Sequence, residues 1–245
     1  MSRVTNAASG TNVHEIASGI FRISTPIPPS AMPGGFTFNQ FLVVDEDPLL
    51  FHTGPRRMFP LVHEAVKHVL GDVAKLRYVS FSHVESDECG SLNEWLAAAP
   101  RSEPVCGMIG AQVSVMDLAD RPPRALADGE ELSLGNRRVR WLDAPHLPHN
   151  WECGYLFEAT TRTLLCGDLF TCPGADVPAL TESDVLGPSE AMRKEMHYAA
   201  MSLGSRAILE KLARTEPTTL ALMHGSTFRG DGRAQLLGLA DALGV

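Results

Sequence analysis

The stretch Ser82-His83-Val84-Glu85-Ser86-Asp87-Glu88-Cys89-Gly90 lies between a predicted strand over residues 76–81 and a predicted helix. His83, Glu85 and Asp87 stand at alternate positions, so an extended segment would project their three side chains to the same side. The carboxylates of such a set would repel one another unless a cation lay between them. We therefore predict a metal site at this strand end, in preference to the alternative of a solvated acidic turn.

Histidine or aspartate also stands at the end of three other predicted strands. His146 and His149 follow the strand 138–142, Asp168 follows the strand 163–166, and His224 follows the strand 218–223. Each position alone has an ordinary explanation as a turn, a helix cap or a core histidine. Four such strand ends together favour a functional site, because loops at strand ends are where rigid scaffolds usually present ligands.

The remaining pattern predicts an α/β fold without strict alternation of strands and helices. Short strands are expected within 20–51 and over 105–109 and 154–158, and helices over 59–70, 91–99, 189–214 and 234–243, with a long Gly/Pro loop over 171–188. Ser91 and Glu94 have the spacing of a capping box at a helix start. We expect a flexible N-terminal tail over residues 1–12 and one domain over residues 13–245.

Composition excludes several classes of protein. The 245 residues are 44% hydrophobic, which is too high for disorder, and the formal net charge of −8 argues against nucleic-acid binding. Five cysteines without a CxxC pair argue against a disulfide framework or a zinc ribbon. No secretory signal or membrane-length apolar run is readable, so we expect a cytoplasmic protein with no membrane partner.

The spaced set of His83-x-Glu85-x-Asp87, His146, Asp168 and His224 resembles the metallo-β-lactamase fold in its diiron branch. Zinc hydrolases of this fold carry His-x-His-x-Asp-His at the first cluster, whereas flavodiiron and oxygen-binding diiron proteins carry His-x-Glu-x-Asp-His. The likeness runs over residues 36–225 and includes His52-Thr53-Gly54, where the fold usually has Asp-Thr-Gly. The resemblance implies a four-layered αββα sandwich with a binuclear site at the strand ends.

The resemblance also implies a role for each residue of the set. His83, Glu85 and His146 would hold the first metal, Asp87 and His224 the second, and Asp168 would bridge them. Glu88 departs from the family's histidine: it either coordinates the second metal, which we favour, or turns away and leaves an open position. Tyr198 is similar to a tyrosine that lines the pocket, and His149 is expected as a ligand's partner, a substrate contact or a turn residue. Tyr198 and His149 are thus the candidate catalytic residues.

The carboxylates of this set favour hard ions of higher charge, so we expect two iron ions, with zinc or manganese as the alternatives. We therefore expect a non-haem diiron protein that binds or reduces O2 or NO. The alternatives are a binuclear hydrolase of an ester, thioester, lactone or phosphoester, and a non-catalytic oxygen or redox sensor. No flavin-binding segment is readable, so electrons are expected from a separate electron-transfer protein, and the resemblance suggests a homodimer.

Overall fold

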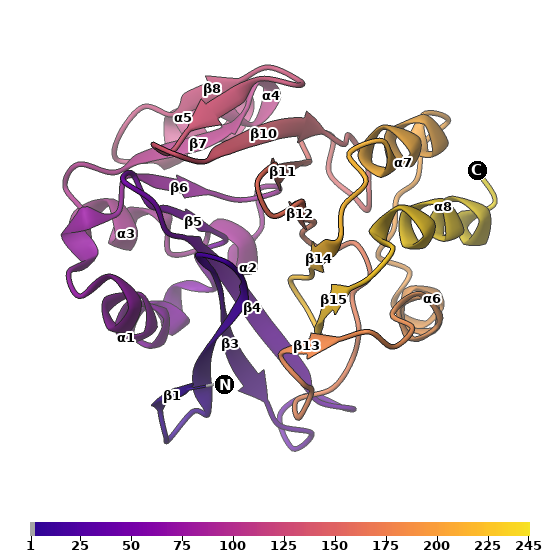
Figure 1. The fold of residues 1–245 in the computed structure, drawn as a ribbon, viewed down its shortest axis with the longest axis horizontal. Helices are drawn as coiled ribbons and strands as arrows, with labels where there is room; N and C mark the ends of the chain where they lie inside the picture. The colour runs from indigo at the N-terminus through magenta and orange to yellow at the C-terminus, as the bar shows by residue number, and fades with distance from the viewer. Residues whose placement is uncertain (1–2) are drawn as a thin grey trace.

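A computed structural model describes residues 3–245, which form two β-sheets packed face to face between helices (Figure 1). The eight strands of the first sheet lie in chain order. They are β1 (Arg3–Asn6), β2 (Thr11–Ala17), β3 (Ile20–Ile27), β4 (Phe36–Val43), β5 (Leu49–Phe51), β6 (Tyr78–Ser80), β7 (Glu103–Gly107) and β8 (Arg124–Leu126). Pairing is antiparallel from β1 to β5 and parallel from β5 to β8.

The second sheet has the strand order β13-β15-β14-β12-β11-β10-β9. Its strands are β9 (Glu131–Ser133), β10 (Arg138–Asp143), β11 (Gly154–Glu158), β12 (Thr163–Leu165), β13 (Leu180–Thr181), β14 (Thr219–Ala221) and β15 (Thr227–Arg229). The parallel pair of β12 and β14 lies at the centre of this sheet, so the loops that follow these two strands emerge at the same edge.

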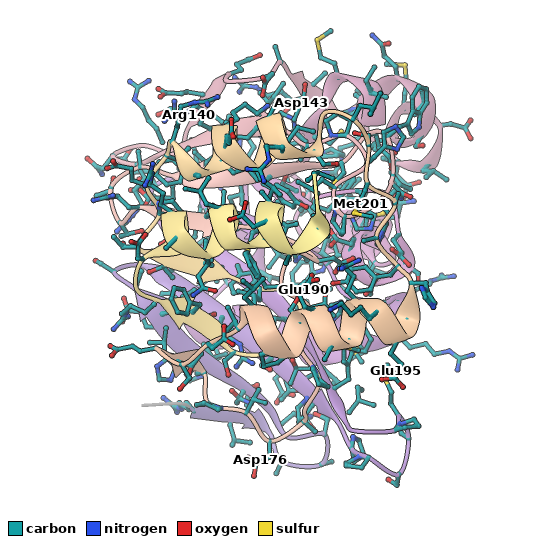
Figure 2. All side chains as sticks on the ribbon, turned by 90° about the vertical axis from the view of Figure 1, so that its right-hand side faces the viewer. Arg140, Asp143, Asp176, Glu190, Glu195 and Met201 are labelled. Carbon is teal, nitrogen blue, oxygen red and sulfur yellow. The ribbon has the colours of Figure 1, made fainter. Side chains whose placement is uncertain are left out.

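Helices cover the outer faces of both sheets. They are α1 (Phe59–Leu70), α2 (Ser86–Cys89), α3 (Leu92–Ala98), α4 (Met108–Gly110), α5 (Met116–Leu118), α6 (Leu186–Met196), α7 (Ser205–Ala213) and α8 (Gly232–Leu243), with short turns η1 (Arg56–Met58), η2 (Val73–Lys75) and η3 (Ala111–Val115). Figure 2 shows α7, α8 and α6 side by side over the second sheet. No helix within residues 3–245 has the length and apolar character needed to cross a membrane.

Three apolar clusters separate the layers. One packs α1 and α3 against the first sheet, a second fills the space between the sheets, and a third packs the second sheet against α7 and α8. Phe41 and Trp141 lie in the middle cluster and are fully buried. The order helix, sheet, sheet, helix confirms the predicted four-layered αββα sandwich.

The first helix forms where its pattern predicts. Val62, Val66 and Leu70 recur at helical spacing and are buried against the first sheet, which gives α1 one apolar face. Gly71 follows with a φ of 77°, a conformation that glycine adopts without steric cost, and the helix ends there. The predicted bounds of 59–70 match those of α1.

Four local predictions differ from the structure. The expected flexible tail over residues 1–12 instead contributes β1, which pairs with β2, although residues 1 and 2 lie outside the described part. The predicted capping box is wrong, because the hydroxyl of Ser91 donates to the main-chain oxygen of Thr53 rather than capping α3. The loop 171–188 contains β13 and the start of α6, and the helix expected over 189–214 is divided into α6 and α7.

Two tryptophans provide a test of the packing. Trp95 of α3 is fully buried and meets the ring of Phe59 edge-on at 5.2 Å, whereas Trp151 is 55% exposed. We expect Trp95→Ala to lower the free energy of unfolding by about 3 to 5 kcal/mol, because it opens a cavity in the core. Trp151→Ala is the matched control and should change it by about 0.5 kcal/mol or less. Urea unfolding of both variants measures this difference, and equal losses of stability would contradict the burial of Trp95 in the core.

Candidate metal centre

The first cluster lies directly after β6, but its backbone is not extended throughout. Glu85 has an extended conformation, with φ −142° and ψ 159°, and is the residue before α2. Asp87 therefore stands on a single helical turn, not on a continued strand as the alternate spacing predicted. The turn of α2 directs Asp87 towards His224, and His83 and Glu85 face a second group of donors.

The other donors come from the second sheet. His149 follows β10, Asp168 follows β12 and His224 follows β14. Since β6 belongs to the first sheet, the site is formed where the strand ends of the two sheets meet. His83, Asp168 and His224 are buried, while the side chains of His149 and Glu85 are 21% and 49% exposed. The site therefore opens to solvent on the side of Glu85 and His149.

Three side chains on one side of Asp168 converge with it on a common point. The Nε2 atoms of His83 and His149 are 2.8 Å apart, and Oε2 of Glu85 lies 2.9 Å from the first and 3.1 Å from the second. Oδ2 of Asp168 lies 3.7 Å from Nε2 of His83 and 3.6 Å from that of His149. One donor atom from each of these four residues lies within 4.8 Å of all the others.

A smaller group lies on the other side of Asp168. Nε2 of His224 lies 3.2 Å from Oδ1 of Asp168 and 3.4 Å from Oδ2 of Asp87. The two carboxylate oxygens of Asp168 thus face different groups, since Oδ2 faces His83 and His149. This is the arrangement that a bridging carboxylate needs.

The three histidines turn the same nitrogen, Nε2, towards the donor cluster. Nδ1 of His149 donates to the main-chain oxygen of Tyr198 at 3.1 Å, and Nδ1 of His224 donates to that of Thr37 at 2.8 Å. Nδ1 of His83 lies 2.9 Å from the hydroxyl of Ser82. A hydrogen bond at one ring nitrogen fixes the orientation of the ring and leaves the other nitrogen for a metal.

The electrostatics of the site favour positive charge. Burial would lower the pKa of His83, but the charge of Glu88 and a hydrogen bond to Glu85 raise that pKa to about 12. Burial likewise opposes the charged form of His224, whose pKa is raised to about 10 by Asp168 and Asp87. Hydrogen bonds from His149 and His83 hold the pKa of Glu85 well below its usual value. The negative charge of the carboxylates thus outweighs the effect of burial on the two histidines, and the same charge would stabilise a bound cation.

These observations test whether the residues fit the metal ions that the resemblance implies. The two facing Nε2 atoms of His83 and His149, 2.8 Å apart beside Oε2 of Glu85, are oriented as ligands of one ion. Oδ1 of the buried Asp168 makes no hydrogen bond and is directed at His224. Mixed imidazole and carboxylate donors suit iron, manganese and zinc. The donor set fits metal ions on both sides of Asp168.

His146 does not join the cluster, although the resemblance gave it a place at the first metal. Its side chain is exposed, and its backbone has a φ of 62°, with its amide donating to the main-chain oxygen of Asn150. This turn directs His146 outward and brings His149 to the donors in its place. The structure therefore places His149, and not His146, beside His83, Glu85 and Asp168.

Glu88 is not directed at the donor cluster either. It is fully buried, with Oε2 accepting a hydrogen bond from the Ser82 amide at 2.8 Å and lying 3.0 Å from Nε2 of His52. Burial raises the pKa of Glu88, but His52 and His83 outweigh this and lower it. Of the two arrangements left open by the sequence, the structure has the one in which Glu88 turns away. The partner His52 was missed, since its only sequence signal was its departure from Asp-Thr-Gly.

Tyr198 lies just beyond the end of α6, not within a helix. Its main-chain oxygen holds the ring of His149, as described above. Burial raises the pKa of its phenol to about 12, an effect that hydrogen bonds to Thr171 and Ser189 offset only in part. Tyr198 therefore contacts His149 through its backbone, and its ring meets the ring of His149 edge-on at 6.2 Å between centroids.

Comparisons with known proteins agree with this architecture. A rubredoxin-oxygen oxidoreductase from Megalodesulfovibrio gigas is 26% identical over 210 residues, which are 81% of this chain and 50% of the relative. The solved rubredoxin oxygen:oxidoreductase from Desulfovibrio gigas matches with a TM-score of 0.77 at 21% identity, over 94% of this chain and 61% of that one. A metal-soaked Flv1 flavodiiron core from Synechocystis sp. PCC6803 matches with a TM-score of 0.77 at 19% identity, over 96% of this chain and 61% of that one.

The chain spans about a third to a half of the length of the curated relatives that it matches. The structural likenesses, at identities below 25%, establish the shared fold. A family model described as ODP family beta lactamase matches residues 36–225, the same range over which the motifs resemble the diiron branch of the metallo-β-lactamase fold. The chain therefore belongs to the ODP family of beta-lactamase-like proteins.

Proposed function

We propose that this chain is a non-haem diiron protein that binds or reduces O2 or NO. The observation that carries the proposal is that the two carboxylate oxygens of Asp168 face different groups. Oδ2 faces His83 and His149, and Oδ1 faces His224. A carboxylate shared in this way, with imidazole and carboxylate donors on both sides, is the ligand chemistry of carboxylate-bridged di-iron sites. The name of the Megalodesulfovibrio gigas relative, a rubredoxin-oxygen oxidoreductase, supports O2 as the small molecule.

The residues divide into two ligand groups in this proposal. His83, Glu85 and His149 would hold the first ion, Asp87 and His224 the second, and Asp168 would bridge them. Two iron ions bound in this way would supply electrons to the small molecule. The partly exposed side chains of Glu85 and His149 open the centre to solvent.

The protein's own side chains set the conditions of the reaction. The carbonyl oxygens of Tyr198 and Thr37 hold the rings of His149 and His224, so that little reorganisation is needed when the ligands engage. The carboxylates stabilise the higher oxidation state of a bound ion, which favours electron transfer out of the site. We propose a separate electron-transfer protein as the donor, in line with the rubredoxin in the relative's name.

Metal analysis combined with a gas pulse tests this function. Protein purified from iron-replete cells and completed with Fe(II) without air should hold about two iron ions per chain. After reduction, a stoichiometric pulse of O2 or NO should be bound or consumed, with an accompanying change in the absorption spectrum. Full occupancy by zinc, a featureless spectrum and hydrolysis of ester or thioester substrates would instead support a binuclear hydrolase. Reversible binding without turnover would indicate a sensor.

A further inference from the structure

The ligand groups on the two sides of Asp168 are unequal. The first side offers His83, Glu85 and His149, whose donor atoms lie within 4.8 Å of one another and of Asp168. The second side offers Asp87 and His224. The residue that follows Asp87 could have completed the second side, but it is the buried Glu88, which is directed elsewhere.

Glu88 is held in that orientation by two contacts. Its Oε2 accepts a hydrogen bond from the Ser82 amide at 2.8 Å and lies 3.0 Å from Nε2 of His52, and neither side chain of the Glu88–His52 pair is exposed. Its other oxygen, Oε1, lies 3.7 Å from Nδ1 of His83, the nitrogen on the far side of that ring from the donor cluster. Turning Glu88 towards the metals would break a buried pair, which is strongly unfavourable because it leaves a buried group without its partner.

We propose that the two metal positions have different affinities, with a tightly bound ion beside His83, Glu85 and His149 and an exchangeable ion beside Asp87 and His224. The exchangeable ion keeps coordination positions that the protein does not fill, and a small exogenous ligand takes one of them. The second ion has fewer protein ligands because Glu88 is paired with His52. This inference rests on the binuclear centre proposed above and adds which of its two positions is open.

The rate of metal release tests the inequality directly on the unmodified chain. Protein loaded with Fe(II) without air is mixed with an excess of an Fe(II)-specific colorimetric chelator, and release is followed by absorbance. We expect two phases of equal amplitude whose rates differ by at least about 10-fold. Release of both ions in one phase would overturn the proposal, and so would saturation at a single ion per chain.

A double variant tests the role assigned to Glu88. Glu88→His combined with His52→Asp exchanges the acid and the imidazole of the buried pair. The imidazole at position 88 can donate one ring nitrogen to the new carboxylate and present the other to the second ion, which the paired glutamate does not do. We expect the fast phase of release to slow by at least about 10-fold, with the slow phase unchanged. Glu182→His, at an exposed glutamate, is the matched control for an added histidine and should leave both phases unchanged. If a correctly folded double variant keeps the fast phase of the unmodified chain, the attribution to Glu88 is overturned.

The proposed function and this inference can fail separately. Two unequal release phases without any reaction with O2 or NO would overturn the function and leave the inequality standing. A single release phase with turnover of O2 or NO would do the reverse. Melting temperatures of the double variant and of the unmodified chain, both measured with the chelator present, show whether the variant folds. If it does not, the two-phase measurement on the unmodified chain still decides the proposal.

Discussion

Asp168→Asn is expected to abolish stable binding of both metal ions. The amide that replaces the carboxylate has a single acceptor oxygen, so one of the two sides must face an NH2 group that cannot ligate. The negative charge that Oδ2 presents to His83 and Oδ1 presents to His224 is lost from both sides together. Even a residue that only hydrogen-bonds to a metal ligand contributes about 10- to 100-fold to metal affinity. Losing the shared ligand should therefore lower the affinity for both ions by more than about 100-fold.

Asp176→Asn is the matched control for this substitution. Asp176 is exposed, and Figure 2 shows it at the lower edge of the molecule, in a loop below α6. The Asp176→Asn substitution makes the same chemical change away from the donors, so the metal content after dialysis should equal that of the unmodified chain. Metal analysis of the dialysed proteins gives the comparison, and the far-ultraviolet circular dichroism of each confirms that it is folded. Retention of both ions by Asp168→Asn would rule out a bridging role for Asp168.

The layered fold could be predicted because its determinants are local or repetitive. The apolar spacing of Val62, Val66 and Leu70 fixes the helix and the face that it buries, whatever packs against it. The strand Gly154–Glu158 likewise has its predicted bounds. The N-terminal strand β1 could not be predicted in the same way, because Arg3–Asn6 is polar and becomes a strand only by pairing with β2.

The strand ends that carry the donors could also be predicted, since polar titratable residues directly after apolar runs are a local signal. The sequence does not predict which of these side chains come into contact. His146 and His149 lie in one loop, three residues apart, and spacing alone does not say which of them reaches His83. That choice is made by the backbone, with a φ of 62° at His146 and a bond from its amide to Asn150. The resemblance in motif therefore points to this loop, and within it the structure brings His149 rather than His146 to the donors.

The partnership of His52 and Glu88 illustrates a second limit. The two residues are 36 positions apart and come from different elements, so no local pattern connects them. Their contact depends on the parallel pairing of β5 with β6, which brings the end of one strand beside the start of the loop after the other. Whether an acidic residue next to Asp87 ligates a metal or pairs with a buried imidazole is decided by this tertiary contact.

His149→Ala is expected to remove the tightly bound ion, whereas His146→Ala should leave the metal content unchanged. Nε2 of His149 lies 2.8 Å from Nε2 of His83 and 3.1 Å from Oε2 of Glu85, and its ring is held by the carbonyl of Tyr198. The side chain of His146 is exposed. Loss of the His149 imidazole should lower the affinity for the first ion by more than about 100-fold. Loss of the exposed His146 imidazole should leave the affinity for both ions unchanged.

The two substitutions remove the same side chain from the same loop. A difference in metal content between the two variants therefore shows which histidine is the ligand. Chelator release separates the ions: the slow phase should disappear from His149→Ala and persist in His146→Ala. His149→Gln refines the result, because its amide oxygen restores a weak donor and should recover part of the affinity. The reverse outcome, with His146→Ala losing the ion and His149→Ala retaining it, would mean that the loop rearranges when metal binds. His146 would then hold the first ion, as the resemblance implied.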